Sequence, residues 1–165
     1  MKWVTNKPVR GDMVRVKAGE LYHFGVYVSD EEVIQFGPIP SRRASMPDSQ
    51  LKVLSSNMDD FLEGGVLEVA EFDWREKLTH RNADEAVDFA RSRIGMGGYH
   101  ILYNNCEHFA YECVTGQRVC HQTDDLRAMF RRLPVVDVYL AAMPDRPMGD
   151  PVACQLRRQE IDGVT

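Results

Sequence analysis

Cys106 has the setting that a nucleophilic thiol needs. It follows Asn104 and Asn105, and because asparagine is a preferred N-cap, Cys106 is expected to open a helix. A helix N-terminus carries partial positive charge and unpaired N–H groups, which stabilise a thiolate and lower the pKa of a cysteine. The same N–H groups can bind an oxyanion. The alternative is that Cys106 only begins the buried face of a helix, since reduced cysteines are often buried.

His23 is the candidate base for this thiol. It lies in the segment 22–28 (YHFGVYV), whose aromatic and β-branched residues are typical of a strand. A polar ring in such a strand needs a partner, and an imidazole within reach of a thiol can take its proton. The alternative is a structural histidine, which is the more common role of a single histidine in a strand.

Gln35 is predicted beside His23 by the register of a hairpin. If the hairpin loop has three residues, Val28 pairs with Glu32, and Gln35 lies on the same sheet face as His23 because side chains alternate along a strand. Gln35 is then a diagonal neighbour of the imidazole, and Gly25 opposite it leaves space between the two. A two-residue loop would turn Gln35 to the opposite face.

The elements that must position these side chains begin with strands. Short apolar and β-branched runs predict strands at 13–17, 22–28, 32–36 and 66–72. The first of them is expected at an edge of the sheet. The connection 38–64 looks irregular, with one short helix at 58–62. The expected fold class is α+β, a small antiparallel sheet packed on helices.

Three longer helices are expected in the second half of the chain. Asn82 with Glu85 forms a capping pair, and Gly95 ends this first helix. Its buried face is predicted to hold Ala86, Phe89, Ala90 and Ile94. The second helix runs from 104 or 105 to Gly116, and its buried face is predicted to hold Cys106, Phe109, Ala110 and Cys113. The third helix is expected at 123–133.

Length and composition indicate one soluble domain. The chain has 165 residues, of which 44% are hydrophobic, enough to form a core, and its net charge is −5. We expect a catalytic domain at 1–143 and a flexible tail at 144–165, where prolines cluster. A negative chain lacks the basic field that nucleic acids require, so no nucleic-acid partner is expected. The same charge gives no attraction to an anionic membrane surface.

No targeting or membrane-spanning segment is predicted. The first residues lack the apolar core of a signal peptide, and no run approaches the ~18 apolar residues of a membrane span. We therefore expect a cytoplasmic protein that contacts membranes at most transiently. Four cysteines in such a chain favour reduced thiols over disulfides. Because no histidines and cysteines have metal-ligand spacing, no metal is expected. The nucleophile and base considered above need no organic cofactor either.

Two motifs, in this order, resemble the lecithin:retinol acyltransferase family. Residues 22–30 (YHFGVYVSD), with VIQ at 33–35, are similar to the histidine block of that family. Residues 104–110 (NNCEHFA) are similar to its cysteine block, whose core is NCEHF. Gly11 and Asp12 ahead of the first strand also fit, and the resemblance covers about residues 8–133.

The resemblance implies a circularly permuted papain-like fold, in which the histidine strands precede the cysteine helix. It implies a nucleophile at Cys106 and a base at His23. Such enzymes form an acyl thioester and pass the acyl group to an alcohol, an amine or water. The family's third polar residue, usually a second histidine, falls on Gln35. A glutamine can still orient an imidazole through one hydrogen bond, as an asparagine does in papain-like proteases.

The sequence therefore predicts a cysteine-dependent acyltransferase or phospholipase A-type acyl hydrolase. Cys106, His23 and Gln35 are its predicted catalytic residues, and a lipid is its expected acyl donor. We expect no C-terminal membrane anchor of the kind found in several animal members. A thiol peptidase or amidase on the same fold is one alternative. A catalytically silent binding module is the other, and Gln35 is the feature that favours it.

Overall fold

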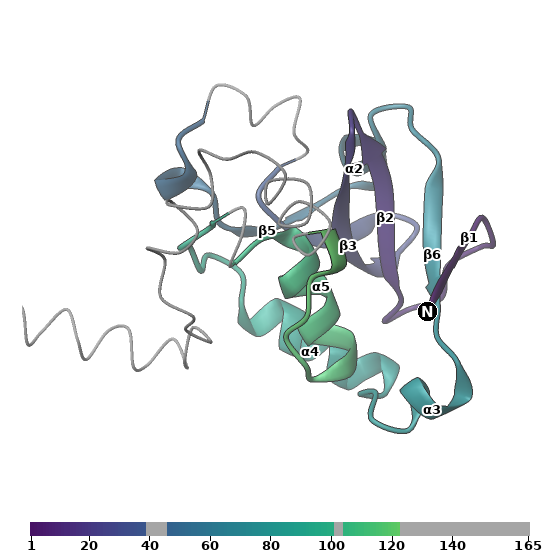
Figure 1. Cartoon of the computed structure of the whole chain (residues 1–165). Coiled ribbons are helices and arrows are strands. Elements are labelled where there is room, and N and C mark those ends of the chain that lie inside the picture. The colour runs from purple at the N-terminus through teal and green to yellow at the C-terminus, as the bar shows by residue number, and fades with distance from the viewer. Residues whose placement is uncertain (39–45, 101–103, 123–165) are drawn as a thin grey trace, which may run out of the picture. The chain divides into compact units, whose positions relative to one another are not determined.

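Six antiparallel strands form the sheet of this protein. The computed structural model describes residues 1–38, 46–100 and 104–122, which Figure 1 shows in colour. The strands are β1 (Lys2–Val4), β2 (Met13–Ala18), β3 (Leu21–Ser29), β4 (Glu32–Phe36), β5 (Val53–Ser56) and β6 (Leu67–Glu71). Their order across the sheet is β1-β6-β2-β3-β4-β5.

Short and longer helices accompany the sheet in the described parts of the chain. They are the 3-10 turn η1 (Asp48–Gln50), α2 (Met58–Leu62), α3 (Trp74–Lys77), α4 (Ala83–Ser92) and α5 (Cys106–Thr115). All lie in one compact unit, Met1–Asp124. The α+β class with a small antiparallel sheet is confirmed, whereas the papain-like permutation and the domain boundary at 143 stay predictions. The predicted helix at 123–133 and the tail at 144–165 lie outside the described residues.

β2 is a central strand, so its predicted place at an edge of the sheet is wrong. β3 pairs along one side of it, with Val16 opposite His23. β6 pairs along the other side, with Val14 opposite Val69. The local sequence of β2 carries no sign of a partner that comes so much later in the chain.

The hairpin of β3 and β4 reaches the predicted register by a different route. Gln35 lies opposite Gly25, as predicted, but Glu32 pairs with Ser29 rather than with Val28. The loop therefore has two residues, and Val28 is an extra residue in β3, a β-bulge. A two-residue loop alone would shift the pairing by one residue and turn Gln35 to the other face of the sheet. The extra residue at Val28 offsets this shift, so Gln35 stays on the face of His23. The expectation that such a loop turns Gln35 to the other face is therefore wrong.

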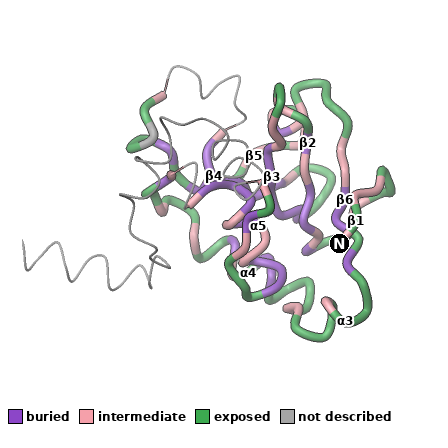
Figure 2. The backbone as a smooth tube through the Cα atoms, in the orientation of Figure 1, coloured by how far each residue is buried: buried purple, intermediate pink, exposed green. Residues whose placement is uncertain are grey.

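The sheet separates two layers of core. On one face, side chains of β3 such as Phe24 and Val26 pack with α4 and α5. On the other face, Tyr27 and Val33 pack with Phe61 of α2. Figure 2 shows buried residues along β3 and β4, in contrast to α3, which is largely exposed. Alternation along β3 thus decides which layer each of its side chains enters.

α4 begins at its predicted cap, and its predicted buried face is confirmed at Ala86 and Ala90, while Phe89 is partly buried against the same core. Asn82 and Glu85 form the capping box, with the Asn82 N–H donating to the Glu85 carboxylate at 3.0 Å. Ile94 was predicted to be buried, yet it is 47% exposed because α4 ends at Ser92 and Ile94 lies beyond the helix. The buried residues of α4 are Ala86, Val87 and Ala90.

The connection 38–64 holds more structure than its composition suggested. α2 occupies 58–62, as predicted. Residues 53–56, however, form β5, which pairs with β4 through Leu54 opposite Gln35. Residues 53–56 form a strand because they pair with β4, and their own sequence shows no clear strand pattern. Residues 39–45 lie outside the described part of the chain.

Candidate active site

Cys106 is the first residue of α5, as the sequence predicted. The side chain of Asn105 caps this helix by accepting hydrogen bonds from the N–H groups of Glu107 and His108, both at 3.0 Å. The ring of His108 contacts the same cap, with its Nδ1 3.0 Å from the Asn105 oxygen. Cys106 itself is 5% exposed. The thiol therefore lies at the positive end of a capped helix, in a largely water-excluded place.

The predicted apolar stripe holds α5 against the sheet. All four of its residues are buried: Cys106, Phe109, Ala110 and Cys113. They share one core cluster with Phe24 of β3 and Phe36 of β4. The rings of Phe36 and Phe109 pack edge to face, with centroids 6.2 Å apart. The stripe thus holds the helix of the candidate nucleophile against the two strands that carry the candidate base and its partner.

His23 is buried in β3 and pairs with Gln35, as predicted. Its side chain is 2% exposed, and its Nε2 lies within hydrogen-bonding distance of the Gln35 Oε1. The imidazole also packs against Phe61 of α2, with ring centroids 5.5 Å apart. Ring and amide thus share the sheet face that α2 covers.

Gln35 is held in place by a residue that the sequence analysis missed. Its Nε2 donates to the Oγ of Ser56 at 2.7 Å, which leaves its Oε1 to accept from His23. With the Gln35 amide in this orientation, a neutral His23 donates from Nε2, and its lone pair then lies on Nδ1. Ser56 belongs to β5, and recognising that strand from the sequence would have been the way to find it.

Gly25 has a stricter role than the sequence suggested. A Cβ at this position would lie 2.6 Å from the Cγ1 of Val33 and 3.1 Å from the Cε2 of Phe61. These side chains, and not only the His23–Gln35 pair, need the space that glycine leaves. A side chain at position 25 would therefore disturb the packing on which the imidazole rests.

Pairing between β3 and β4 stops two residues before the imidazole. The last pair is Gly25 with Gln35, and Gly37 then turns the chain away with a φ of 75°. His23 consequently lies where β3 has no β4 neighbour. Cys106 belongs to the core layer on the other face of the sheet. The predicted approach of its sulfur to the His23 ring stays a prediction.

The remaining described thiols have different surroundings. Cys106, Cys113 and Cys120 are buried and form no disulfide, as predicted, and Cys154 lies outside the described residues. Burial raises the pKa of the Cys113 thiol far above its usual range. The Sγ of Cys120 donates to Glu107 at 3.0 Å. Only Cys106 among these three opens a helix.

Glu107 is a second residue without a role in the sequence analysis. It is 1% exposed, and its carboxylate accepts from four donors. They are the Sγ of Cys120, the backbone N–H and Nδ1 of His121, and the backbone N–H of Gln122. Its place directly after Cys106 in the NCEHF motif was the signal that could have drawn attention to it.

A cavity of about 530 Å³ opens beside Gln35. Its described lining includes Gln35, Leu54, Ser56, Asn57 and Asp60. None of these residues belongs to α5, so we do not assign this cavity to an acyl chain. Among the described residues, no group of three His, Cys, Asp or Glu side chains could hold a metal ion. In the same part of the chain, no helix has both the length and the apolar character needed to cross a membrane.

Comparison with known proteins gives one consistent result. The family model described as lecithin retinol acyltransferase matches residues 6–119, a span that contains Cys106, His23 and Gln35. The chain is 27% identical over 137 residues to lecithin retinol acyltransferase of Rattus norvegicus, covering 72% of this chain and 59% of that protein. It is also 27% identical over 133 residues to lecithin retinol acyltransferase of Homo sapiens, covering 70% and 58%.

The chain therefore spans less than two thirds of the length of these relatives. The family match nevertheless covers more than half of this chain and includes both sequence blocks on which the resemblance rested. The protein is a member of the lecithin retinol acyltransferase family.

Proposed function

We propose that this protein is a cysteine-dependent acyltransferase or acyl hydrolase in which Cys106 is the nucleophile and His23 the base. The observation that carries the proposal is the buried His23–Gln35 pair on the strand against which the Cys106 helix packs. Membership of the family supports acyl transfer, and the name of its relatives points to a lipid as acyl donor.

The first step is transfer of the Cys106 proton to the Nδ1 of His23. Since Nε2 donates to Gln35, Nδ1 is the nitrogen with a lone pair. The thiolate then attacks the acyl carbonyl, and the carbonyl oxygen becomes an oxyanion. The N–H groups of Glu107 and His108 are bound to the Asn105 cap. We assign the N–H of Cys106, at the positive start of α5, as a donor to this oxyanion.

The second half of the reaction returns the enzyme to its starting state. Protonated His23 gives its proton to the leaving alcohol, and the acyl group remains on Cys106 as a thioester. An acceptor alcohol, amine or water next loses a proton to His23 and attacks the thioester. The product leaves with the acyl group, and the Cys106 sulfur recovers its proton.

The end of β4 pairing supports the approach of the two groups. Cys106 and His23 start from different core layers. Pairing between β3 and β4 ends at Gly25 and Gln35. Beyond this pair, the backbone of β4 does not separate the Cys106 sulfur from the His23 imidazole. We propose this notch as the place of proton transfer and acyl attack.

Intact-mass measurement after incubation with diheptanoyl phosphatidylcholine tests the proposal. A mass gain of one heptanoyl group, mapped by peptide analysis to Cys106, is the expected result. Cys106→Ala should show no gain, and Cys113→Ala, which alters the matching thiol on the same helix, should behave as the parent. A parent that takes up no acyl group from this lipid or from p-nitrophenyl butyrate contradicts the proposal.

The silent binding module remains the second candidate because Gln35 stands where the family usually has histidine. It makes a distinct prediction in the same experiment. The parent would then form no thioester, whereas Gln35→His would gain the ability to form one.

A further inference from the structure

We propose that Glu107 and Gln122 are positioning residues that hold the strand of the base in register with the helix of the nucleophile. The inference rests on the proposed function of Cys106 and His23. We name the chain of hydrogen bonds from Glu107 through Gln122 to Tyr22 the Glu107–Gln122 link. It joins the residue after the nucleophile to the residue before the base.

The link begins at the buried carboxylate of Glu107. Its Oε1 accepts from the N–H of His121 at 2.9 Å, and its Oε2 accepts from the N–H of Gln122 at 3.0 Å. The Sγ of Cys120 and the Nδ1 of His121 complete the set of donors, each at 3.0 Å. A carboxylate with 1% exposure needs such donors to offset its lost hydration. The first turn of α5 therefore fixes residues 120–122.

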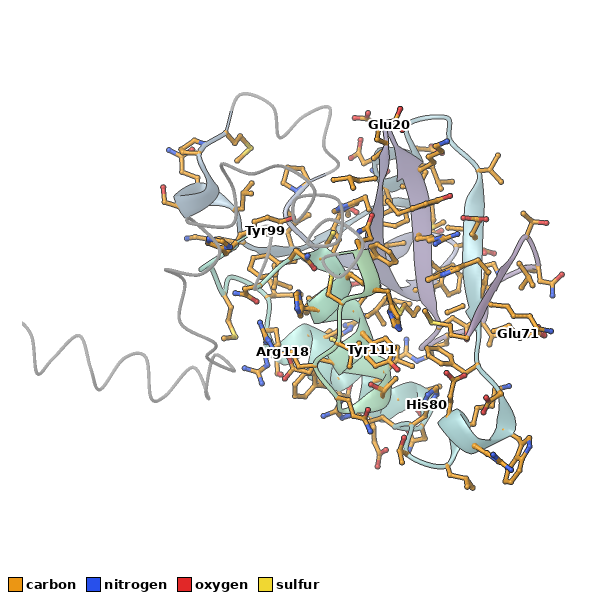
Figure 3. All side chains as sticks on the ribbon, viewed as in Figure 1. Glu20, Glu71, His80, Tyr99, Tyr111 and Arg118 are labelled. Carbon is orange, nitrogen blue, oxygen red and sulfur yellow. The ribbon has the colours of Figure 1, made fainter. Side chains whose placement is uncertain are left out.

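The chain reaches this position by turning back along α5. Gly116 ends the helix in the left-handed conformation, with a φ of 75°. Arg118 then lies beside the helix, where Figure 3 labels it together with Tyr111. Its guanidinium donates to Glu112 at 2.9 Å and also to the side chain of Asn104, just before the helix. Residues 116–122 thus return toward the end of α5 at which Cys106 lies.

The link ends on the backbone of β3. The side-chain oxygen of Gln122 accepts from the N–H of Tyr22 at 2.7 Å, and its amide nitrogen donates to the Tyr22 carbonyl at 3.1 Å. Tyr27 directs its own N–H and carbonyl toward the β2 side, to Asp12 and Gly11. Because these directions alternate along a strand, Tyr22 directs its groups to the β4 side, where β4 has ended. Gln122 therefore takes the place of a strand neighbour.

The position of the two hydrogen bonds determines what they control. Tyr22 directly precedes His23, and Glu107 directly follows Cys106. A shift of β3 along α5 would break the amide contacts of Gln122 before it altered the apolar stripe. The link therefore sets the distance between sulfur and ring, while neither of its residues touches the substrate. Its loss should lower the rate of acylation and leave the KM for the acyl donor unchanged.

Gln122→Met is the sharpest variant, because it keeps the length of the side chain and removes both hydrogen bonds without changing any charge. The titratable and charged groups around this part of the molecule all stay as they are. They are Glu107, His108, Arg118, Cys120 and His121 on and after α5, and Arg15, Tyr22 and His23 on the sheet.

The measurement is the rate at which iodoacetamide alkylates Cys106 at pH 6 and at pH 9. At pH 6 the thiolate depends on His23, so Gln122→Met should react about tenfold more slowly than the parent, the effect of two lost hydrogen bonds. At pH 9 hydroxide can also remove the thiol proton, so the reaction depends less on His23 and the difference between the two proteins should narrow. Glu107→Gln should show the same pattern, and the double variant should add little because both residues act in one chain.

Two matched variants serve as controls. Gln117→Ala removes an exposed glutamine from the same returning segment, and Asp88→Asn alters an exposed carboxylate on α4, the helix that packs beside α5. Both should alkylate as the parent does at either pH. Circular dichroism shows whether each variant folds, and if Gln122→Met does not fold, Glu107→Gln carries the test.

The outcomes separate this inference from the proposed function. Alkylation needs no acyl donor, so a parent that reacts rapidly at pH 6 but forms no thioester refutes the proposed function alone. Variants of the link that react as fast as the parent at pH 6 overturn the positioning role. Variants that are equally slow at pH 6 and pH 9 also overturn it, because they indicate a general disturbance of α5.

Discussion

The two ends of α5 carry the same residue type in different chemical surroundings. Cys106 and Cys113 lie on one buried face, with exposures of 5% and 0%. At the first end, the Asn105 side chain caps the N–H groups of the helix. At the second, Arg81 donates to the carbonyls of Glu112 and Cys113, the latter at 3.1 Å. The peptide dipoles thus point their positive end at Cys106 and their negative end at Cys113.

The comparison shows that burial is common to both thiols, so burial alone does not set the proposed nucleophile apart from Cys113. Both thiols are removed from water, and for Cys113 this raises the pKa. The difference lies in the polar partners at the start of the helix and in the direction of its dipole. The predictions below test how far this contrast between the two ends holds.

The largest effect is expected from removing each thiol in turn. Cys106→Ala should abolish thioester formation, whereas Cys113→Ala should retain it and lose on the order of 1 kcal/mol of stability from the atoms removed. Intact mass after incubation with a short-chain phosphatidylcholine and a urea melt of each variant provide the two readouts. If Cys106→Ala still formed a thioester, Cys106 would not be the nucleophile, and the proposed difference between the two thiols would be wrong.

The next effect is selectivity toward iodoacetamide. Only the thiolate reacts, and the raised pKa keeps Cys113 protonated until the pH is very high. At pH 6, Cys106 should therefore react at least about a hundredfold faster than Cys113, and the ratio should narrow as the pH rises. Peptide mapping of the labelled protein gives both rates. Equal labelling at pH 6 would show that the start of α5 does not activate its thiol.

Helix capping offers a smaller effect with a matched control. Asn105 and Asn82 are N-cap residues with capping boxes, on α5 and α4. Each change to alanine should lower the free energy of unfolding by about 1 kcal/mol. Only Asn105→Ala should also slow the alkylation of Cys106. If Asn82→Ala slowed it equally, global stability rather than the local cap would control the thiol.

Gln35 should have the smallest effect, because it acts through His23. Gln35→Ala removes one orienting hydrogen bond, worth about 0.5–1.5 kcal/mol, and should slow thioester formation roughly two- to tenfold. Gln35→His should stay active, since it places the family's usual residue on the same sheet face. The accumulation of acyl-enzyme over time, followed by mass, gives the rates. If the rate of thioester formation fell a thousandfold in Gln35→Ala, Gln35 would have a role beyond orienting the His23 ring.

Features with a local signal were predictable from the sequence. The asparagine caps at positions 82 and 105, the buried stripe from Cys106 to Cys113, and the strand that carries His23 each follow from neighbouring residues. The contact between Gln35 and His23 was also predicted, although the loop length assumed for it was wrong. Apolar periodicity and capping act between neighbouring residues, so these features could be predicted without knowledge of distant partners.

Features that join distant segments were missed. Ser56 binds Gln35 from β5, a strand that the sequence of residues 53–56 does not predict on its own. Gln122 binds the backbone of Tyr22 across a hundred positions of the chain. Backbone groups carry no residue identity, so no pattern in the sequence marks Tyr22 as a partner. The central place of β2 was missed for the same reason, because β6 supplies its second neighbour.

The bulge at Val28 bears on how this chain should be aligned with its relatives. It adds one residue to β3 without moving Gly25 from its place opposite Gln35. A relative with one residue fewer between its histidine and its third polar residue could keep the same facing pair with a regular two-residue hairpin. An alignment gap in such a relative belongs at Val28 rather than within the turn. Placed in the turn, it would change which residues appear to pair while the pair itself stayed the same.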